Sequence, residues 1–217
     1  MLSRPSEPTV YPVKEHYFES VVDHYNFFPT PALTSPLRYL VNDKHYRRLA
    51  GPCFFYAGNE ANIVQFVNNI GFVFEAAAKF GALVVFAEHR YYGKILPLGV
   101  VSLGSPYNAS LLTVEQAMAD LNSLSRHIRD RWSIPSRSAF VAFGGSYSAN
   151  LALWMRLKNP NIWAGAVASS ATPLKHFLRT SNGFAQIETE AYGNVSSCYP
   201  DLVREGWTNL YRSAATE

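Results

Sequence analysis

The sequence predicts an α/β fold in which a mostly parallel sheet carries helices on both faces. Ala82–Ala87 is continuously apolar, as expected for a strand that is buried on both faces of a parallel sheet. Strand-like and helix-like segments alternate from there on, which implies parallel strands joined by crossover helices. At Phe143–Asn150 an apolar strand runs through two glycines and a serine into a helical pattern.

The individual elements can be assigned in chain order. Residues 1–14 hold three prolines and little pattern, so we expect a flexible arm. Alternating or continuous apolar runs predict strands, and apolar positions three and four residues apart predict helices. The expected strands are Glu15–Asp23, Leu37–Val41, Cys53–Ala57, Ala82–Ala87, Ser138–Phe143 and Ala164–Ser169, and the expected helices are Ile63–Phe80, Thr113–Trp132 and Ala149–Lys158.

The helix that begins after Thr113 has the clearest start signal. Thr113 is the expected N-cap, and Gln116 is its expected partner in a capping box. Pro135 follows the helix and ends it. After Pro173 no convincing apolar strand follows, and only the segment 202–210 suggests an amphipathic helix.

The turn around Ser146 matches the nucleophile elbow of the α/β-hydrolase fold. In that elbow a serine lies at the apex of a sharp, strained turn between a strand and a helix, so its hydroxyl projects clear of the backbone. Strand and helix approach so closely that the neighbouring positions must be small, as Gly144 is. Ser148 stands where the pattern has its second glycine. It is also small, so we expect the turn to survive.

The same turn offers hydrogen-bond donors for a reacting oxyanion. The backbone N–H of Tyr147 begins a helix and can face the oxyanion of a tetrahedral intermediate. A second donor is expected from the loop after the third strand, where Gly58 and Asn59 lie. The plainer alternative is an ordinary strand-to-helix turn, but the buried strand before Ser146 and the helix after it favour a nucleophile.

Three titratable residues follow the strand Ala82–Ala87. Glu88, His89 and Arg90 come at its carboxyl end, where loops line the ligand crevice of a parallel sheet. They are therefore candidates for binding a charged group of a substrate. For Glu88 and Arg90 we favour the alternative of a buried charge pair that anchors the loop. His89 precedes Ser146, and the usual hydrolase order of serine, aspartate and histidine argues against it as the catalytic base.

Composition and short motifs bear on nucleic-acid binding, membrane spans, signal peptides and glycosylation. The net charge is +3 and the basic residues are scattered, so nucleic acid is not an expected partner. No apolar run approaches the roughly 20 residues of a membrane span, and the N-terminus lacks the apolar core of a signal peptide. Sequons at Asn108 and Asn194 are candidate glycosylation sites.

The two cysteines do not define a metal site. Cys53 and Cys198 lie far apart in the sequence, without cysteines or histidines nearby at ligand spacing. They could pair with each other or stay free, and two cysteines are too few to indicate a redox compartment. No metal and no cofactor is expected.

Four blocks of the sequence resemble one family of serine peptidases. They are Gly51–Glu60, Glu88–Lys94, Leu112–Ala117 and Gly144–Tyr147, and they occur in the family's order. The family contains lysosomal Pro-X carboxypeptidase, dipeptidyl peptidase II and thymus-specific serine protease. The resemblance covers most of the chain.

The resemblance implies a serine exopeptidase that cuts a peptide substrate near proline or alanine, with Ser146 as its nucleophile. It implies that residues 15–173 are the N-terminal part of an α/β-hydrolase core and that residues 174–217 begin a helical insert domain. Family members are lysosomal, vesicular or secreted. They are also longer, and the aspartate and histidine of their triad lie in the part that is absent here. We therefore expect a C-terminally truncated member that is inactive by itself.

Two other functions stay open at this point. A different α/β-hydrolase, such as an esterase, could use the same elbow, and a comparison of peptide with ester substrates would separate the two. A non-catalytic binding protein derived from the peptidase is the third alternative, because a truncated sheet would expose an edge that a partner could cover. A homodimer is a possible assembly.

Overall fold

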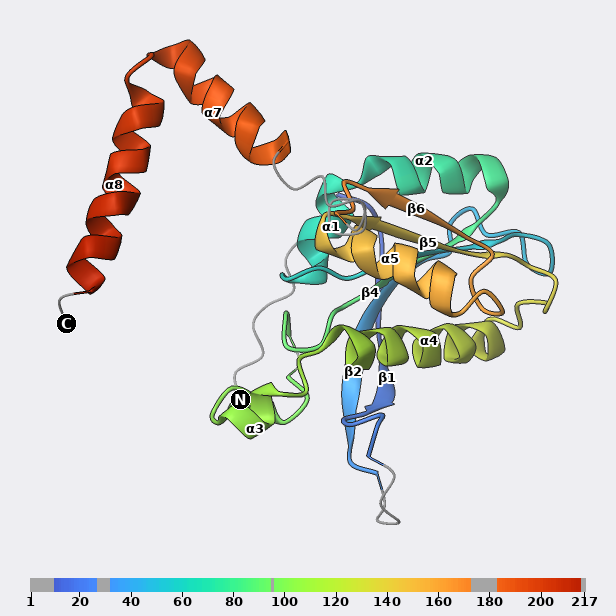
Figure 1. Cartoon of the computed structure of the whole chain (residues 1–217). Coiled ribbons are helices and arrows are strands. Elements are labelled where there is room, and N and C mark those ends of the chain that lie inside the picture. Colours follow the sequence, from blue (N-terminus) through green and yellow to red (C-terminus); the bar gives the residue numbers. More distant parts are fainter. Residues whose placement is uncertain (1–9, 27–31, 95, 173–182, 216–217) are drawn as a thin grey trace. The chain divides into compact units, whose positions relative to one another are not determined.

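The computed structural model describes residues 10–26, 32–94, 96–172 and 183–215. The chain divides into two compact units, Met1–Thr172 and Pro173–Glu217, which are described separately below. The first unit holds all six strands of the sheet (Figure 1).

A single mixed sheet forms the centre of the first unit. Its strands are β1 (Lys14–Val21), β2 (Thr34–Asn42), β3 (Cys53–Ala57), β4 (Leu83–Ala87), β5 (Phe140–Gly145) and β6 (Gly165–Ser169). They lie in the order β1-β2-β4-β3-β5-β6. β1 and β2 are antiparallel, as are β2 and β4, whereas β4, β3, β5 and β6 run parallel. The prediction of a mostly parallel sheet is confirmed.

Helices cover both faces of this sheet (Figure 1). The helices described in the first unit are α1 (Ile63–Asn69), α2 (Gly71–Phe80), α3 (Pro106–Ala109), α4 (Val114–Arg131) and α5 (Tyr147–Lys158), with a short 3-10 helix at Gly99–Val101. Buried side chains of α1 and α2 pack against one face of the sheet, and those of α4 and α5 pack against the other. The result is a three-layer α/β/α arrangement.

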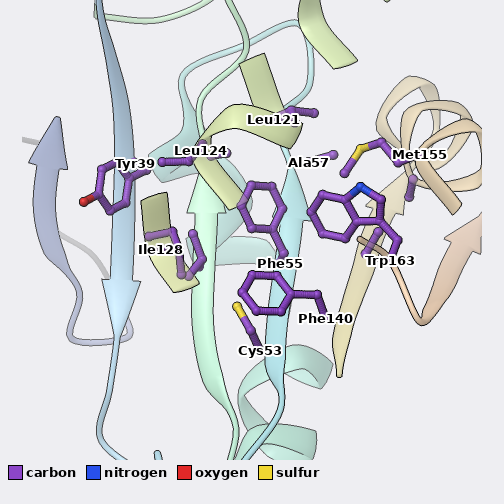
Figure 2. Packing of buried hydrophobic residues seen from close by; sticks show 14 of the residues in the cluster. Tyr39, Cys53, Phe55, Ala57, Leu121, Leu124, Ile128, Phe140, Met155 and Trp163 are labelled. Atoms are coloured by element: carbon purple, nitrogen blue, oxygen red, sulfur yellow. The ribbon is translucent and has the colours of Figure 1, made fainter. Parts of the chain in front are cut away.

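Aromatic side chains fill the core between the sheet and the helices α4 and α5 (Figure 2). The rings of Phe55 and Trp163 have centroids 5.0 Å apart, and those of Phe140 and Trp163 are 6.1 Å apart. The indole N–H of Trp163 donates to the side-chain oxygen of Asn122 at 2.8 Å, so its polar edge is satisfied inside the core. This contact connects α4 to the segment that leads into β6.

The helix predicted over 63–80 is two helices. Ile70 leaves the helical backbone, with φ −114° and ψ 78°, and separates α1 from α2. Gly71 opens α2, and a Cβ at this position would lie 3.0 Å from the Tyr11 hydroxyl. The prediction of one helix is wrong because apolar positions continue toward the sheet on both sides of the break.

The described end of the arm predicted over residues 1–14 contacts α1 and α2. The Tyr11 ring stacks on Phe74 with a centroid distance of 4.0 Å, and the backbone N–H of Val10 donates to the side chain of Asn68 at 2.8 Å. A stacked aromatic ring can hold a segment against a helix even where the surrounding sequence has no apolar pattern. Residues 1–9 lie outside the described residues.

The predicted N-cap of α4 is confirmed, but its capping box is not. The hydroxyl of Thr113 accepts a hydrogen bond from the backbone N–H of Gln116 at 3.2 Å. The Gln116 side chain instead donates to Asp23 at 2.6 Å and accepts from the backbone N–H of His24 at 3.0 Å. It therefore ties α4 to the turn after β1, an interaction that short-range spacing cannot reveal.

The described part of the second unit contains α7 (Gly183–Val195) and α8 (Tyr199–Ala214). The predicted amphipathic segment 202–210 is part of α8, and its Leu202, Trp207 and Leu210 side chains are exposed. Whether this unit begins a helical insert domain stays a prediction. None of the helices described in either unit is both long and apolar enough to cross a membrane.

Candidate active site

Ser146 makes the sharp turn between β5 and α5. Its backbone has φ 57° and ψ −124°, a combination that residues with side chains rarely adopt and that costs about 1–3 kcal/mol. β5 ends at Gly145 and α5 begins at Tyr147, so the serine alone makes the reversal. The residue is exposed, as a nucleophile at the apex of such a turn must be.

Gly144 allows the strand and the helix to approach. A Cβ at this position would lie 2.1 Å from the carbonyl oxygen of Ser148 and 2.6 Å from the nitrogen of Ala149. Both are backbone atoms that cannot swing aside. The turn around Ser146 therefore requires glycine here, as its sequence indicates.

Ser148 fits where the hydrolase pattern has glycine. It is completely buried, and its hydroxyl accepts a hydrogen bond from the backbone N–H of Gly145 at 2.9 Å. The same hydroxyl lies 3.2 Å from the hydroxyl of Tyr56. The serine side chain thus bridges the two arms of the turn, and the turn is retained.

The loop after β3 reaches this turn through the side chain of Asn59. Its Nδ2 donates to the carbonyl oxygen of Gly145 at 2.9 Å, and its Oδ1 accepts from the backbone N–H of Ser148 at 2.8 Å. One amide therefore holds the backbone on both sides of Ser146. Because Asn59 is only 6% exposed, water cannot easily take over these two bonds. We refer to this pair of hydrogen bonds as the Asn59 clamp.

Gly58 and the Tyr147 amide complete the immediate surroundings of Ser146. A Cβ on Gly58 would lie 2.5 Å from the carbonyl oxygen of Ala87 and 2.6 Å from the nitrogen of His89, so glycine lets the loops after β3 and β4 pack together. The N–H of Tyr147 is the first of α5, and the first N–H groups of a helix have no acceptor within it. It is thus available for an oxyanion.

His89 lies beside the turn with both ring nitrogens engaged. Its Nδ1 is 2.6 Å from the carbonyl oxygen of Arg90, to which it can only donate, and its Nε2 is 3.0 Å from the Tyr147 hydroxyl. Burial lowers the pKa of His89, and burial also raises the pKa of Tyr147 to about 12. A neutral imidazole therefore accepts a hydrogen bond from a protonated tyrosine. Neither nitrogen is directed to Ser146.

Glu88 is held in a buried network. Its carboxylate lies 3.1 Å from the Arg38 guanidinium and accepts hydrogen bonds from the backbone N–H groups of Ile63 at 3.3 Å and Lys94 at 2.9 Å. Burial raises its pKa, against the opposing effect of these donors. Gly93, with φ 140°, leaves room for the carboxylate, because a Cβ there would lie 2.1 Å from it.

Arg90 is paired with a different residue. Its guanidinium contacts the Asp120 carboxylate twice, at 2.6 and 2.8 Å, and also donates to the carbonyl oxygen of Val22 at 3.0 Å. Burial alone would raise the pKa of Asp120, but hydrogen bonds from His24 and Arg90 hold it below its usual value. The expectation of one mutual pair between Glu88 and Arg90 is wrong. Each anchors the loop after β4 to another element.

A catalytic base for Ser146 is not found among the residues that the structure describes. Among the described residues, an imidazole and a carboxylate pair where His24 lies 2.8 Å from Asp120. Both side chains are already part of the Arg90 network. The described acids that follow Ser146 in sequence all belong to the second unit, and His176 lies outside the described residues. Those acids are Glu188, Glu190, Asp201 and Glu205.

The remaining predicted sites are the two sequons and the two cysteines. Asn108 is in α3, and its side-chain nitrogen donates to the carbonyl oxygen of Val101 at 2.8 Å. Asn194 is exposed near the end of α7. Cys53 and Cys198 are free thiols, the first buried in β3 and the second exposed in the second unit. Burial raises the pKa of the Cys53 thiol, which makes it unreactive.

Sequence comparison places the chain among known peptidases. The model of the serine carboxypeptidase S28 family matches residues 21–217. The chain belongs to the serine carboxypeptidase S28 family. The resemblance to a family of serine peptidases noted from its sequence blocks is confirmed.

Several curated S28 relatives are similar over most of this chain. Lysosomal Pro-X carboxypeptidase of Mus musculus is 46% identical over 193 residues, which are 88% of this chain and 39% of the relative. The Homo sapiens protein of the same name is 36% identical over 222 residues, covering 99% and 44%. Thymus-specific serine protease of Homo sapiens is 34% identical over 158 residues, covering 73% and 30%. The chain thus spans less than half the length of these S28 relatives.

A solved structure supports the fold of this S28 chain. A candidate dipeptidyl aminopeptidase IV from Bacteroides ovatus superposes with a TM-score of 0.53 and 14% sequence identity, covering 74% of this chain and 21% of that one. At this identity the likeness concerns the fold alone. The predicted α/β-hydrolase fold is confirmed.

Proposed function

We propose that Ser146 is the nucleophile of a serine exopeptidase that hydrolyses peptide bonds near proline or alanine, of the Pro-X carboxypeptidase or dipeptidyl peptidase II kind. The observation that carries this proposal is the strained backbone of Ser146, at φ 57° and ψ −124°, between β5 and α5 of an S28 family member. Strain of this kind persists only where the surroundings enforce it. Here Gly144, Ser148 and the Asn59 clamp do so.

The surroundings of Ser146 suit acyl transfer. The serine hydroxyl attacks the peptide carbonyl carbon while its proton passes to a base, and the carbonyl oxygen becomes an anion. The N–H of Tyr147 and a backbone amide of Gly58 or Asn59 bind that oxygen. The carbon–nitrogen bond then breaks as the amine takes the proton, and water releases the acyl group from the serine.

The 217-residue chain by itself hydrolyses peptides slowly or not at all. Within the described residues, both nitrogens of His89 are engaged by Arg90 and Tyr147, and the pair of His24 with Asp120 serves the Arg90 network. Without a base from the described residues, only the oxyanion donors and substrate binding remain. In serine proteases these supply a small part of the full acceleration.

A lysosomal, vesicular or secreted location accompanies this proposal. Lysosomal relatives support it, and Asn194 is an exposed site for a glycan. Asn108 is less suited, because attachment would disturb the hydrogen bond from its side-chain nitrogen to Val101. The peptide is the proposed partner, and sedimentation of the purified chain would test the homodimer.

The proposal is tested with a chimera. Residues 1–217 replace the matching segment of Mus musculus lysosomal Pro-X carboxypeptidase, which supplies the rest of a peptidase of this family. We expect hydrolysis of a blocked peptide ending in Pro-Phe or of a Lys-Pro arylamide, and the preferred substrate identifies the type of exopeptidase. The unextended chain should show no activity that depends on Ser146.

Two serine variants test whether the activity of the chimera depends on Ser146. Ser146→Ala should abolish turnover in the chimera, whereas Ser136→Ala, at an exposed loop position, should not change it. A folded chimera that is inactive, or one that stays active in Ser146→Ala, contradicts the assignment of the nucleophile. If the unextended chain hydrolyses the substrate and loses this activity in Ser146→Ala, only the prediction that the unextended chain is inactive is contradicted.

A further inference from the structure

A basic pocket lies where β1 begins and α4 ends. Its volume is about 540 Å³, and the charged groups that line it are Lys14, His16, Asp43, Arg48 and Arg131. None of the residues that form the turn around Ser146 lines it. Four basic side chains therefore face one carboxylate in a pocket separate from the proposed active site.

The single acid in this pocket is already engaged. The Lys14 ammonium and the Asp43 carboxylate form an ion pair at 3.2 Å. Among the described residues, neither Arg48 nor Arg131 is part of an ion pair. The carbonyl end of α4 offsets part of the charge of Arg131, its last residue. Arg48 belongs to a separate loop, so an excess of positive charge remains in the pocket.

Aromatic rings form one wall of the pocket. The ring of His16 stacks on Tyr39 at a centroid distance of 5.3 Å and meets the edge of Trp132 at 5.6 Å. The Arg131 guanidinium carbon lies 5.3 Å from the Trp132 ring centre. The Arg131 guanidinium thus lies over the ring of a half-buried indole. Together they form a surface suited to a planar or ring-shaped group that carries negative charge.

The field inside the pocket acts on His16. Burial lowers the pKa of His16 most, and the positive charges of Arg131 and Lys14 lower it further, as does His127. Asp43 opposes them. The positive potential therefore reaches the wall of the pocket and is not confined to the tips of the arginines.

We propose that this pocket binds a phosphate or sulfate monoester carried on a ring. The guanidinium groups of Arg48 and Arg131, which form no ion pair with any described residue, offer the donors that a tetrahedral oxyanion accepts. The Trp132 wall can pack against the ring. The volume of the pocket falls within the range of about 300–1,000 Å³ that is usual for sites of small organic ligands. Sugar phosphates and sulfated sugars share this chemistry.

Calorimetric titration of the 217-residue chain tests the proposal. The probes are glucose 6-phosphate, glucose 6-sulfate, inorganic phosphate and glucose, at low ionic strength because salt screens exposed charges. We expect both esters to bind more tightly than inorganic phosphate and glucose not to bind. Binding should raise the pKa of His16, measured by the resonances of its ring, since a bound anion favours the charged imidazole.

Arginine variants locate the site. Arg48→Gln and Arg131→Gln should each weaken the binding of the esters about fivefold, the effect of losing one exposed charge contact. Arg126→Gln is the matched control, because Arg126 is also an exposed arginine of α4 but does not line the pocket. Thermal unfolding verifies that each variant is folded.

Three results would overturn the proposal. They are no binding of either ester at millimolar concentration, an equal loss of binding in Arg126→Gln, and inorganic phosphate binding as tightly as both esters. If one ester alone binds with the expected variant pattern, the proposal holds and that ester identifies the ligand class.

Discussion

Replacing Asn59 by alanine should destabilise the chain by about 2–3 kcal/mol. The backbone N–H of Ser148 lies in the first turn of α5 and has no acceptor within the helix, so losing its 2.8 Å bond to Asn59 leaves it unpaired. A buried unpaired N–H costs about 1–3 kcal/mol. The carbonyl oxygen of Gly145 loses its bond from Asn59 but keeps a 3.0 Å bond from the Ser148 hydroxyl. Losing the Asn59 bond therefore costs less, about 0.5–1 kcal/mol.

Two measurements test this estimate. Urea unfolding followed by tryptophan fluorescence reports on the first unit, because Trp163 is completely buried there, and the expected change in the unfolding equilibrium is about 30- to 150-fold. Hydrogen exchange of the Ser148 amide reports on the clamp itself. This amide should lose protection in Asn59→Ala beyond what global destabilisation explains.

Asn69→Ala is the matched control for this experiment. Asn69 is exposed and its side chain donates to Gln65 within its own helix, at 2.7 Å, so the free energy of unfolding should change by less than about 0.5 kcal/mol. An Asn59→Ala variant that is as stable as the Asn69→Ala control, with an equally protected Ser148 amide, would refute the reasoning.

Three further predictions concern the packing and the charges of the first unit. Gly144→Ala should cost about 3 kcal/mol or more, because its Cβ would lie 2.1 Å from a backbone carbonyl, whereas Gly165→Ala meets no atom within 4 Å and should cost less than about 1 kcal/mol. Equal melting temperatures of the two variants would contradict this. The pKa of His89 lies below its usual value mainly because of burial. The unfolded chain therefore binds more protons, and the free energy of unfolding should fall as the pH drops below about 6.5. Urea titrations on both sides of that pH should show a smaller fall in His89→Gln, and an unchanged fall would count against the assignment. Asp120→Ala leaves Arg90 buried without its carboxylate and should cost about 3–5 kcal/mol in the same assay, so a midpoint like that of the wild type would contradict the role of the pair.

The turn around Ser146 could be predicted because its causes are local. A strand that reverses into a helix across one residue needs small neighbours, and Gly144 and Ser148 supply them within five positions of the sequence. The apolar run of β4 is equally local evidence, because a strand that is covered on both faces has no polar positions. Fold class and candidate nucleophile therefore follow from short windows of sequence.

The partners of Glu88 and Arg90 could not be predicted in this way. The two residues are close in sequence, but Glu88 contacts Arg38 of β2 and Arg90 contacts Asp120 of α4. Which charge meets which depends on the order of the strands, and no spacing in the sequence reports that order. The same holds for Tyr11. It belongs to a segment without a pattern, and its packing against Phe74 is visible only in the structure.

The Asn59 clamp joins residues from two distant parts of the chain, since 89 positions separate Asn59 from Ser148. On a ribosome that adds about 5–20 residues per second, this interval corresponds to roughly 4–18 s of synthesis. During that time β3 has no β5 to pair with, although β5 is its neighbour in the finished sheet. The strained serine therefore acquires its geometry only after β5 and the start of α5 have been made, and an emerging chain would expose one edge of β3 until then.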